Sequence, residues 1–190
     1  MSLQGALNFI SSGGNIGNKV SKVNIWGPNI TNASKMFNVN SASITDFFAY
    51  LPNATNVNRM MNSAVLNVAD IDIGAAPFNP AGNVLGSTGV NKMNVFKLTS
   101  NSSEWLMTNI SAGLMSAYGL RDFTFFTNQP LTQRLFAPMR WSNMRNININ
   151  IPNSTHASIF PESDSTTYGA QLKNLQCINV SAEKSTRLWG

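Results

Sequence analysis

A short pattern recurs along this chain, and it constrains the possible folds more than any other feature. The first copy covers residues 23–37, and residues 52–62 repeat part of it about 24 positions later. In both copies a Pro-Asn pair is followed in step by Thr, Asn, a basic residue and Met. A third, more diverged copy covers residues 147–160. Self-similarity at a fixed period of this length is typical of solenoids, in which stacked units share one core.

Short runs in which apolar and polar residues alternate recur along the whole chain. Four runs begin at residues 23, 47, 71 and 95, and three more begin at residues 123, 147 and 175. The first four therefore begin at one constant interval, whereas the later interval is looser. Alternation predicts a strand with one buried face. Six or seven short strands at nearly regular spacing predict a stack in which each unit covers the edge of the next.

A second element is expected between the strands. Residues 31–37 and 55–61 each begin with Thr, which is a good helix N-cap, and each carries a Met about a turn and a half later. Met36 and Met60 would then point back toward the strand layer. Pro28 and Pro52 suit a sharp turn after the strand. Residues 75–89 are rich in Gly and Pro and are expected to form a loop instead.

Residues 29–37 (Asn-Ile-Thr-Asn-Ala-Ser-Lys-Met-Phe) and 149–154 (Ile-Asn-Ile-Pro-Asn-Ser) resemble the characteristic phrases of BspA-like leucine-rich repeats. Residues 53–61 and 172–180 have a similar cadence. The resemblance is good over residues 21–75, patchy over 94–180 and absent at 1–20. It implies a solenoid that binds partners at surfaces without catalysis, as in cell-surface adhesins and parts of large assemblies. Leucine is scarce at the strand positions, however, and the third unit lacks its helix.

We therefore predict a leucine-rich-repeat-like solenoid of short parallel strands joined by short helices or loops. The repeat domain would cover residues 21–180, with an N-terminal arm or cap at 1–20 and a tail at 181–190. The alternative is an all-β sandwich or jelly-roll-like virion subunit, to which long loops at 75–93 and 161–169 would be suited. The interval between the alternating runs is wider than the usual spacing of strands in a sandwich.

The composition favours a protein that contacts other molecules over broad surfaces. Charged residues make up only 11% of the chain, and Asn, Ser and Thr are abundant instead. Adhesins and virion subunits share this composition, although AT-rich codons would also produce it. The net charge of +5 is scattered, and its densest group is Arg134, Arg140 and Arg145. A solvated face explains this group better than a nucleic-acid surface does.

The N-terminal sequence has no basic region followed by an apolar run, so no signal peptide is expected. No run reaches the 18 or so apolar residues that a membrane span requires, so no membrane insertion is expected either. We expect the protein on a virion or on the extracellular surface of an assembly. Its partners would be other protein subunits, including copies of itself.

The sequence contains no recognisable catalytic constellation, and we expect neither enzymatic activity nor a cofactor. The single histidine, His156, falls in a turn and is expected at the surface. The single cysteine, Cys177, lies in an apolar stretch and is expected to be a buried free thiol. Three carboxylates, Asp46, Asp70 and Asp72, are a weak candidate for a calcium site. Exposed acids that discourage edge-to-edge pairing are the better explanation, so no metal is expected.

The residues between the buried strand positions should form a column that points away from the core. We expect this column to bind a protein partner or another copy of the chain, because aromatic residues are enriched in interface cores. Its members are Asn24, Phe48, Asp72, Phe96, Thr124 and Asn148. The predicted function is a non-enzymatic structural or protein-binding subunit of an assembly such as a phage particle. The alternative is an adhesin-type module that binds host protein or glycan.

Overall fold

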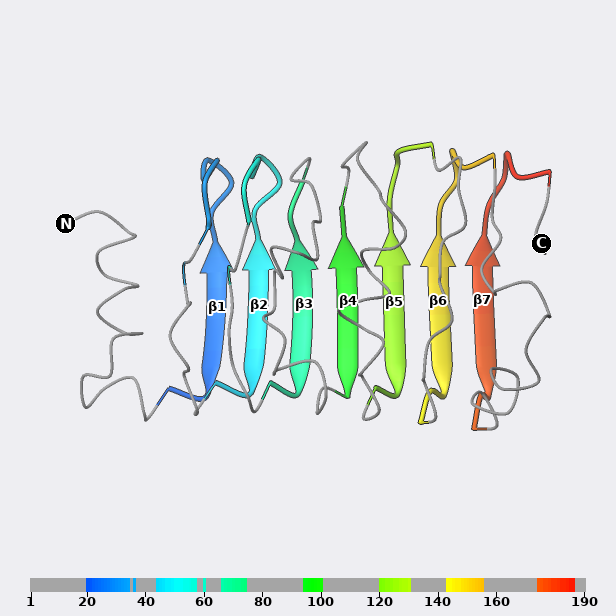
Figure 1. The fold of residues 1–190 in the computed structure, drawn as a ribbon, viewed down its shortest axis with the longest axis horizontal. Coiled ribbons are helices and arrows are strands. Elements are labelled where there is room, and N and C mark those ends of the chain that lie inside the picture. The colour runs from blue at the N-terminus through cyan, green and yellow to red at the C-terminus, as the bar shows by residue number, and fades with distance from the viewer. Residues whose placement is uncertain are drawn as a thin grey trace.

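The protein forms a single parallel sheet of seven short strands, as shown by a computed structural model (Figure 1). The structure describes residues 20–34, 36, 44–57, 60, 66–74, 94–100, 120–130, 143–155 and 174–186. Each strand has five residues, and the strands are β1 (Lys22–Trp26), β2 (Asp46–Tyr50), β3 (Val68–Asp72), β4 (Val95–Thr99), β5 (Asp122–Phe126), β6 (Asn146–Asn150) and β7 (Cys177–Ser181). Their order in the sheet is their order in the chain. This is the arrangement of a repeat solenoid, in which each unit contacts its neighbours.

The same hydrogen bonds recur where each strand begins. The carbonyl oxygen of the residue before a strand accepts two backbone N–H groups from the next unit. Ser21, for example, accepts from Thr45 at 2.8 Å and from Asp46 at 3.0 Å. At the other end of the stack, the Arg145 carbonyl accepts from Gln176 and Cys177 at 2.8 and 3.0 Å. Because this pair of hydrogen bonds is repeated between all six neighbouring pairs, every strand enters the sheet with the same backbone geometry.

The strands bury alternate side chains on one face of the sheet. The second strand position holds Val23, Phe47, Ala69, Phe96, Phe123, Ile147 and Ile178, and the fourth holds Ile25, Ala49, Ile71, Leu98, Phe125, Ile149 and Val180. All of these except the two in β7 are buried. Within the core, the rings of Phe96 and Phe123 lie 5.8 Å apart. This face therefore supplies the hydrophobic core of the stack.

A tight turn follows the strand in four of the units. The N–H of Ile30 donates to the Gly27 carbonyl at 3.0 Å, which is the bond between the first and fourth residues of a β-turn. Ala54, Ser154 and Ser185 make the equivalent bond in their own units, also at 3.0 Å. In three of these turns a proline occupies the second position, where its restricted φ is suited to the turn.

The third unit approaches the second unusually closely at Gly74. This residue has a φ of 57°, in the left-handed region that favours glycine. A Cβ atom at this position would lie 1.9 Å from the Pro52 carbonyl oxygen. The neighbouring unit therefore requires glycine here for two reasons, one conformational and one steric.

The predicted parallel stack is confirmed, whereas the alternative of facing antiparallel sheets fails because all six strand pairings are parallel. The described parts of residues 31–37 and 55–61 form no helix, and an isolated parallel bridge joins Asn32 to Asn56 there. Met36 and Met60 are buried in the core as expected. The predicted loop at 75–89, the N-terminal arm before residue 20 and His156 lie outside the described residues.

The constant interval expected from the first copies is wrong for the middle of the chain. The strands begin at residues 22, 46, 68, 95, 122, 146 and 177, so the interval shortens between β2 and β3 and lengthens on both sides of β4. As a result, Ile71 aligns with Ala49 and Ile25, not with Phe47 and Val23. Val95 occupies the first, outward position of its strand, and its neighbour Phe96 faces the core. The three segments that connect β2 to β3, β3 to β4 and β4 to β5 each differ in length from the segment that connects β1 to β2, so counting residues from the first copy gives the wrong register.

Candidate functional site

The face of the sheet opposite the core is formed by the first, third and fifth residues of each strand, and we refer to it as the outward face. The third positions hold Asn24, Phe48, Asp70, Lys97, Thr124, Asn148 and Asn179. The fifth positions hold Trp26, Tyr50, Asp72, Thr99, Phe126, Asn150 and Ser181. Parallel, in-register pairing places residues of the same position next to one another along the sheet.

Four of the six residues predicted for the outward column lie in it, at the third strand position: Asn24, Phe48, Thr124 and Asn148. Asp72 is on the same face but at the end of β3, between Tyr50 and Thr99. Phe96 is the clear error, because it is 0% exposed and lies in the core. A slip of one residue in strand register moves a side chain to the opposite face of the sheet.

Two exposed aromatic residues dominate the N-terminal end of the outward face. The rings of Trp26 and Tyr50 stack with centroids 4.3 Å apart and planes at 19°. Trp26 is 74% exposed and Tyr50 is 36% exposed. Beside them, the ammonium group of Lys22 lies 5.0 Å from the centre of the Phe48 ring. We call Trp26, Phe48 and Tyr50 the aromatic cluster.

The prediction from sequence included Phe48 but missed Trp26 and Tyr50. Both lie one residue beyond the short alternating runs from which the strands were predicted. A signal was present, however, because the two aromatics recur at the same interval as the first two copies and end two consecutive strands. Their pairing follows directly from the register, which sets Trp26 opposite Tyr50.

Charges of both signs surround the aromatic cluster. Lys97 and Asp70 form an ion pair at 3.7 Å, with side chains 53% and 48% exposed. Asp46 accepts a hydrogen bond from the Thr45 hydroxyl at 2.7 Å, and Asp72 accepts one from the Gly74 N–H at 3.2 Å. The surface around the cluster therefore carries charges of both signs, and several of its charged groups already form an ion pair or a hydrogen bond within the protein.

The three carboxylates considered for calcium occupy different strand positions. Asp46 is at the first position of β2, whereas Asp70 and Asp72 are at the third and fifth positions of β3. Within the described ranges, no three His, Cys, Asp or Glu residues gather as a metal site would require. Each of the three carboxylates has another partner, namely a lysine, a hydroxyl or a backbone N–H.

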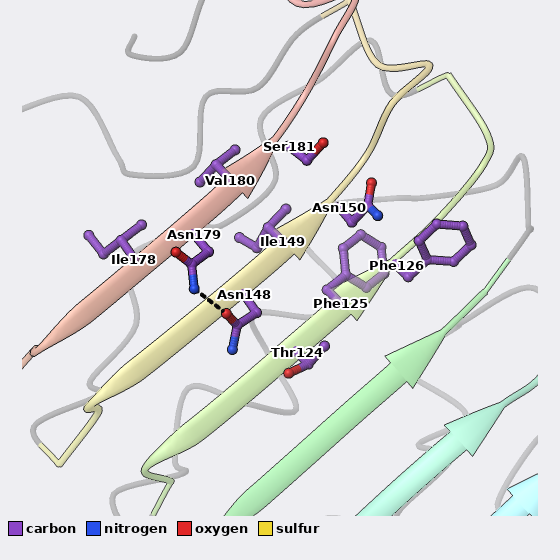
Figure 2. Close-up of a pocket in the computed structure, with 10 residues that line it drawn as sticks. All are labelled: Thr124, Phe125, Phe126, Asn148, Ile149, Asn150, Ile178, Asn179, Val180 and Ser181. Carbon is purple, nitrogen blue, oxygen red and sulfur yellow. Dashed lines mark hydrogen bonds between the residues drawn. The ribbon is translucent and has the colours of Figure 1, made fainter.

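A shallow groove with both polar and apolar lining residues lies at the opposite end of the sheet, over β5, β6 and β7 (Figure 2). Its apolar lining includes Phe125, Ile149, Ile178 and Val180. Its volume is about 580 Å³. The polar side chains on its walls are Thr124, Asn148, Asn150, Asn179 and Ser181, and the ring of Phe126 lies at one side. The Asn179 amide donates to the Asn148 side-chain oxygen at 2.7 Å. None of the residues that line this groove is charged.

Two further predictions concern single residues. Cys177 is exposed, not buried. It occupies the first, outward position of β7, and the described residues place no further strand beside it to cover it. Arg145 precedes β6 and is also exposed, whereas Arg134 and Arg140 lie outside the described residues.

The described segments include no helix long and apolar enough to cross a membrane.

Comparison of the chain with family models, curated proteins and solved structures finds no match.

Proposed function

We propose that this protein is a non-enzymatic, protein-binding subunit of a larger assembly. The observation that carries the proposal is the stack of Trp26 on Tyr50, exposed on a regular sheet face. Burying two such rings against water would be favourable, and contact with a second protein would achieve it. The partner is another folded protein, which includes other copies of this chain.

The surroundings of the cluster support a protein as the partner. Interfaces commonly have an apolar, aromatic centre and a polar rim, and Trp and Tyr are enriched among the residues that dominate binding energy. Here the rim contains Lys22, Asp70 and Lys97. Because Trp26 and Tyr50 already stack on one another, little conformational freedom is lost when a partner covers them.

The finer fold assignment is part of this proposal. We infer kinship with BspA-like leucine-rich repeats from the Pro-Asn turns, the short parallel strands and the buried Met36 and Met60. A virion or other surface assembly is the setting that suits a chain with few charges and many amide side chains. The absence of a catalytic constellation in the sequence supports a binding role over an enzymatic one.

The test is a comparison of two variants on the same face. A partner is first identified from the protein's natural source by co-purification and mass spectrometry, and is then purified. The Trp26→Ala/Tyr50→Ala variant should bind this partner roughly 30-fold more weakly, because the two stacked rings act as one unit that should contribute about 2 kcal/mol at an interface centre. Phe126→Ala is the matched control, since it changes an aromatic at the same strand position in β5. Equal binding by both variants would contradict the proposal.

A second candidate is an adhesin-type module that binds glycans through the groove over β5–β7. Asparagine amides both donate and accept hydrogen bonds, as sugar hydroxyls do, and the groove has no charge to attract an ion. An array of neutral oligosaccharides separates the two functions. Binding that is lost in Asn148→Ala and kept in Trp26→Ala would favour the glycan-binding module over the protein-binding one.

A further inference from the structure

Strand β7 is the last strand of the described sheet and lies at the C-terminal end of the row (Figure 1). Among the described residues it pairs with β6 alone. Ile178 is 41% exposed, although its neighbours in register, Ile147 and Phe123, are 0% exposed. At this end the core side chain Ile178 is therefore incompletely covered, and within the described part of the chain the outer backbone groups of β7 have no strand beside them.

The residues of β7 also include none of those that usually discourage pairing between sheet edges. Its sequence, Cys-Ile-Asn-Val-Ser, contains no charged residue and no proline. Strand β1, at the other end of the row, differs from β7 in its charge and in how well its core-facing side chains are covered. It carries Lys22, and its core-facing residues Val23 and Ile25 are only 9% and 8% exposed. The end at β7 is thus the one that gains most from an added strand.

The sequence of β7 is symmetric in chemistry about Asn179. An apolar β-branched residue lies on each side of it, Ile178 and Val180, and a small residue of similar size lies beyond each of these, Cys177 and Ser181. When such a strand pairs with an identical strand running in the opposite direction, each apolar residue faces an apolar residue on the same side of the sheet.

We propose that two copies of this chain associate through β7, paired antiparallel about a two-fold axis at Asn179. Ile178 of one copy faces Val180 of the other, which closes both cores. The two Asn179 amides meet on the outward face and extend the hydrogen bond that Asn179 makes to Asn148. Cys177 of each copy lies opposite Ser181 of the other. The interface is isologous, so the association stops at a dimer, the commonest symmetric assembly.

This dimer is independent of the proposed function. The aromatic cluster lies on β1 and β2, at the far end of the row from β7, so pairing would leave it accessible (Figure 1). A dimer would present two aromatic clusters on one continuous sheet. The Trp26→Ala/Tyr50→Ala variant should lose partner binding and still dimerise. Partner binding that is kept would contradict the proposed function alone, and a monomeric wild type would contradict the dimer alone.

Cysteine cross-linking tests the register directly. Opposed residues in an antiparallel pair have Cα atoms about 4.5–5.5 Å apart, within the range that a disulfide spans. In the Ser181→Cys variant, the new thiol lies opposite the native Cys177 of the second copy, so mild oxidation should give a covalent dimer. The Cys177→Ser/Ser181→Cys variant is the matched control. It should not cross-link, because two thiols at position 181 lie at opposite ends of the paired strands.

Sedimentation equilibrium at tens of micromolar supplies the second measurement. The wild-type chain should have the mass of a dimer, and Ile178→Lys should be a monomer that melts in the same cooperative way, because Ile178 is already exposed. A monomeric wild type would overturn the proposal. Masses that grow with concentration would overturn it in favour of head-to-tail pairing of β7 with β1. Cross-linking of the control to the same extent as the Ser181→Cys variant would overturn the antiparallel register.

Discussion

The side-chain amide of Asn53 donates a hydrogen bond to the backbone carbonyl of Pro28, 2.7 Å away in the preceding unit. Four units later the contact recurs, because the Asn153 amide donates to the Asn128 carbonyl at 2.8 Å. Asn53 and Asn153 occupy the same position of the turn that follows their strands. The repeated Asn of the Pro-Asn pair therefore links one turn to the next and fixes the distance between units at the strand exits.

We expect Asn53→Ala to lower the free energy of unfolding by about 0.5–1.5 kcal/mol, the usual net value of one hydrogen bond. The value should be near the lower limit because Asn53 is exposed and water can replace the lost donor. Urea denaturation followed by circular dichroism measures the change. Asn29→Ala is the control, since Asn29 has the same place in the first turn but no described unit before it. Equal losses in both variants would show that the contact between units contributes nothing.

Much of the fold was predictable because burial and repetition both leave traces in the sequence. The alternating runs at residues 23–25, 47–49, 123–125 and 147–149 lie wholly within strands. Their apolar residues are in the core, as the alternation predicts, except for Phe48 on the outward face. The two runs at 71–73 and 175–178 only overlap their strands. In these cases apolar residues outside the strand also contribute to the core, as Ile73 does, so hydrophobicity alone does not mark the strand boundary.

The outward face was less predictable, because its residues are constrained by the register and not by burial. The segments before β3 and before β4 differ by a few residues from the segment between β1 and β2. This difference left Ile71 on its predicted face but moved Phe96 to the opposite one. The aromatic stack depends on the same register, since Trp26 and Tyr50 are adjacent only when β1 and β2 pair in step. Cys177 is exposed for the same reason, because it takes the first, outward position of β7 while Ile178 and Val180 take the core-facing positions.

The same substitution at two phenylalanines distinguishes the two faces of the sheet. Phe96→Ser should destabilise the fold by roughly 3 kcal/mol or more, because it removes a fully buried ring and leaves a cavity. Phe48→Ser should cost about 1 kcal/mol, since this ring is half-buried and its main partner is the Lys22 ammonium group. Thermal and urea unfolding of both variants measure the difference. Comparable losses at the two positions would contradict the observed register.

Gly74 should tolerate substitution less well than Gly27. In Gly74→Ala, the new methyl would meet the Pro52 backbone carbonyl and the residue would have to keep a left-handed conformation. We expect a loss of about 2 kcal/mol or more in the free energy of unfolding. In Gly27→Ala, the methyl would meet the side chains of Ile30 and Leu51, which can move more easily than backbone. The melting temperature of Gly74→Ala should therefore be the lower of the two, and the opposite order would contradict this reasoning.

The ion pair between Lys97 and Asp70 should contribute little to stability and should also disfavour a cation at Asp70. Both side chains are about half exposed, so a double-mutant cycle with Asp70→Asn and Lys97→Met should give a coupling of roughly 0.2–1 kcal/mol. The coupling should fall as salt is added, because exposed charges are screened.

Since the lysine already pairs with the Asp70 carboxylate, millimolar calcium should leave the melting temperature of the wild type unchanged. A calcium-dependent rise that disappears in Asp70→Asn would show instead that the ammonium group of Lys97 gives way to a bound ion. Lys22→Met serves as the control, because Lys22 lies over an aromatic ring rather than beside this carboxylate.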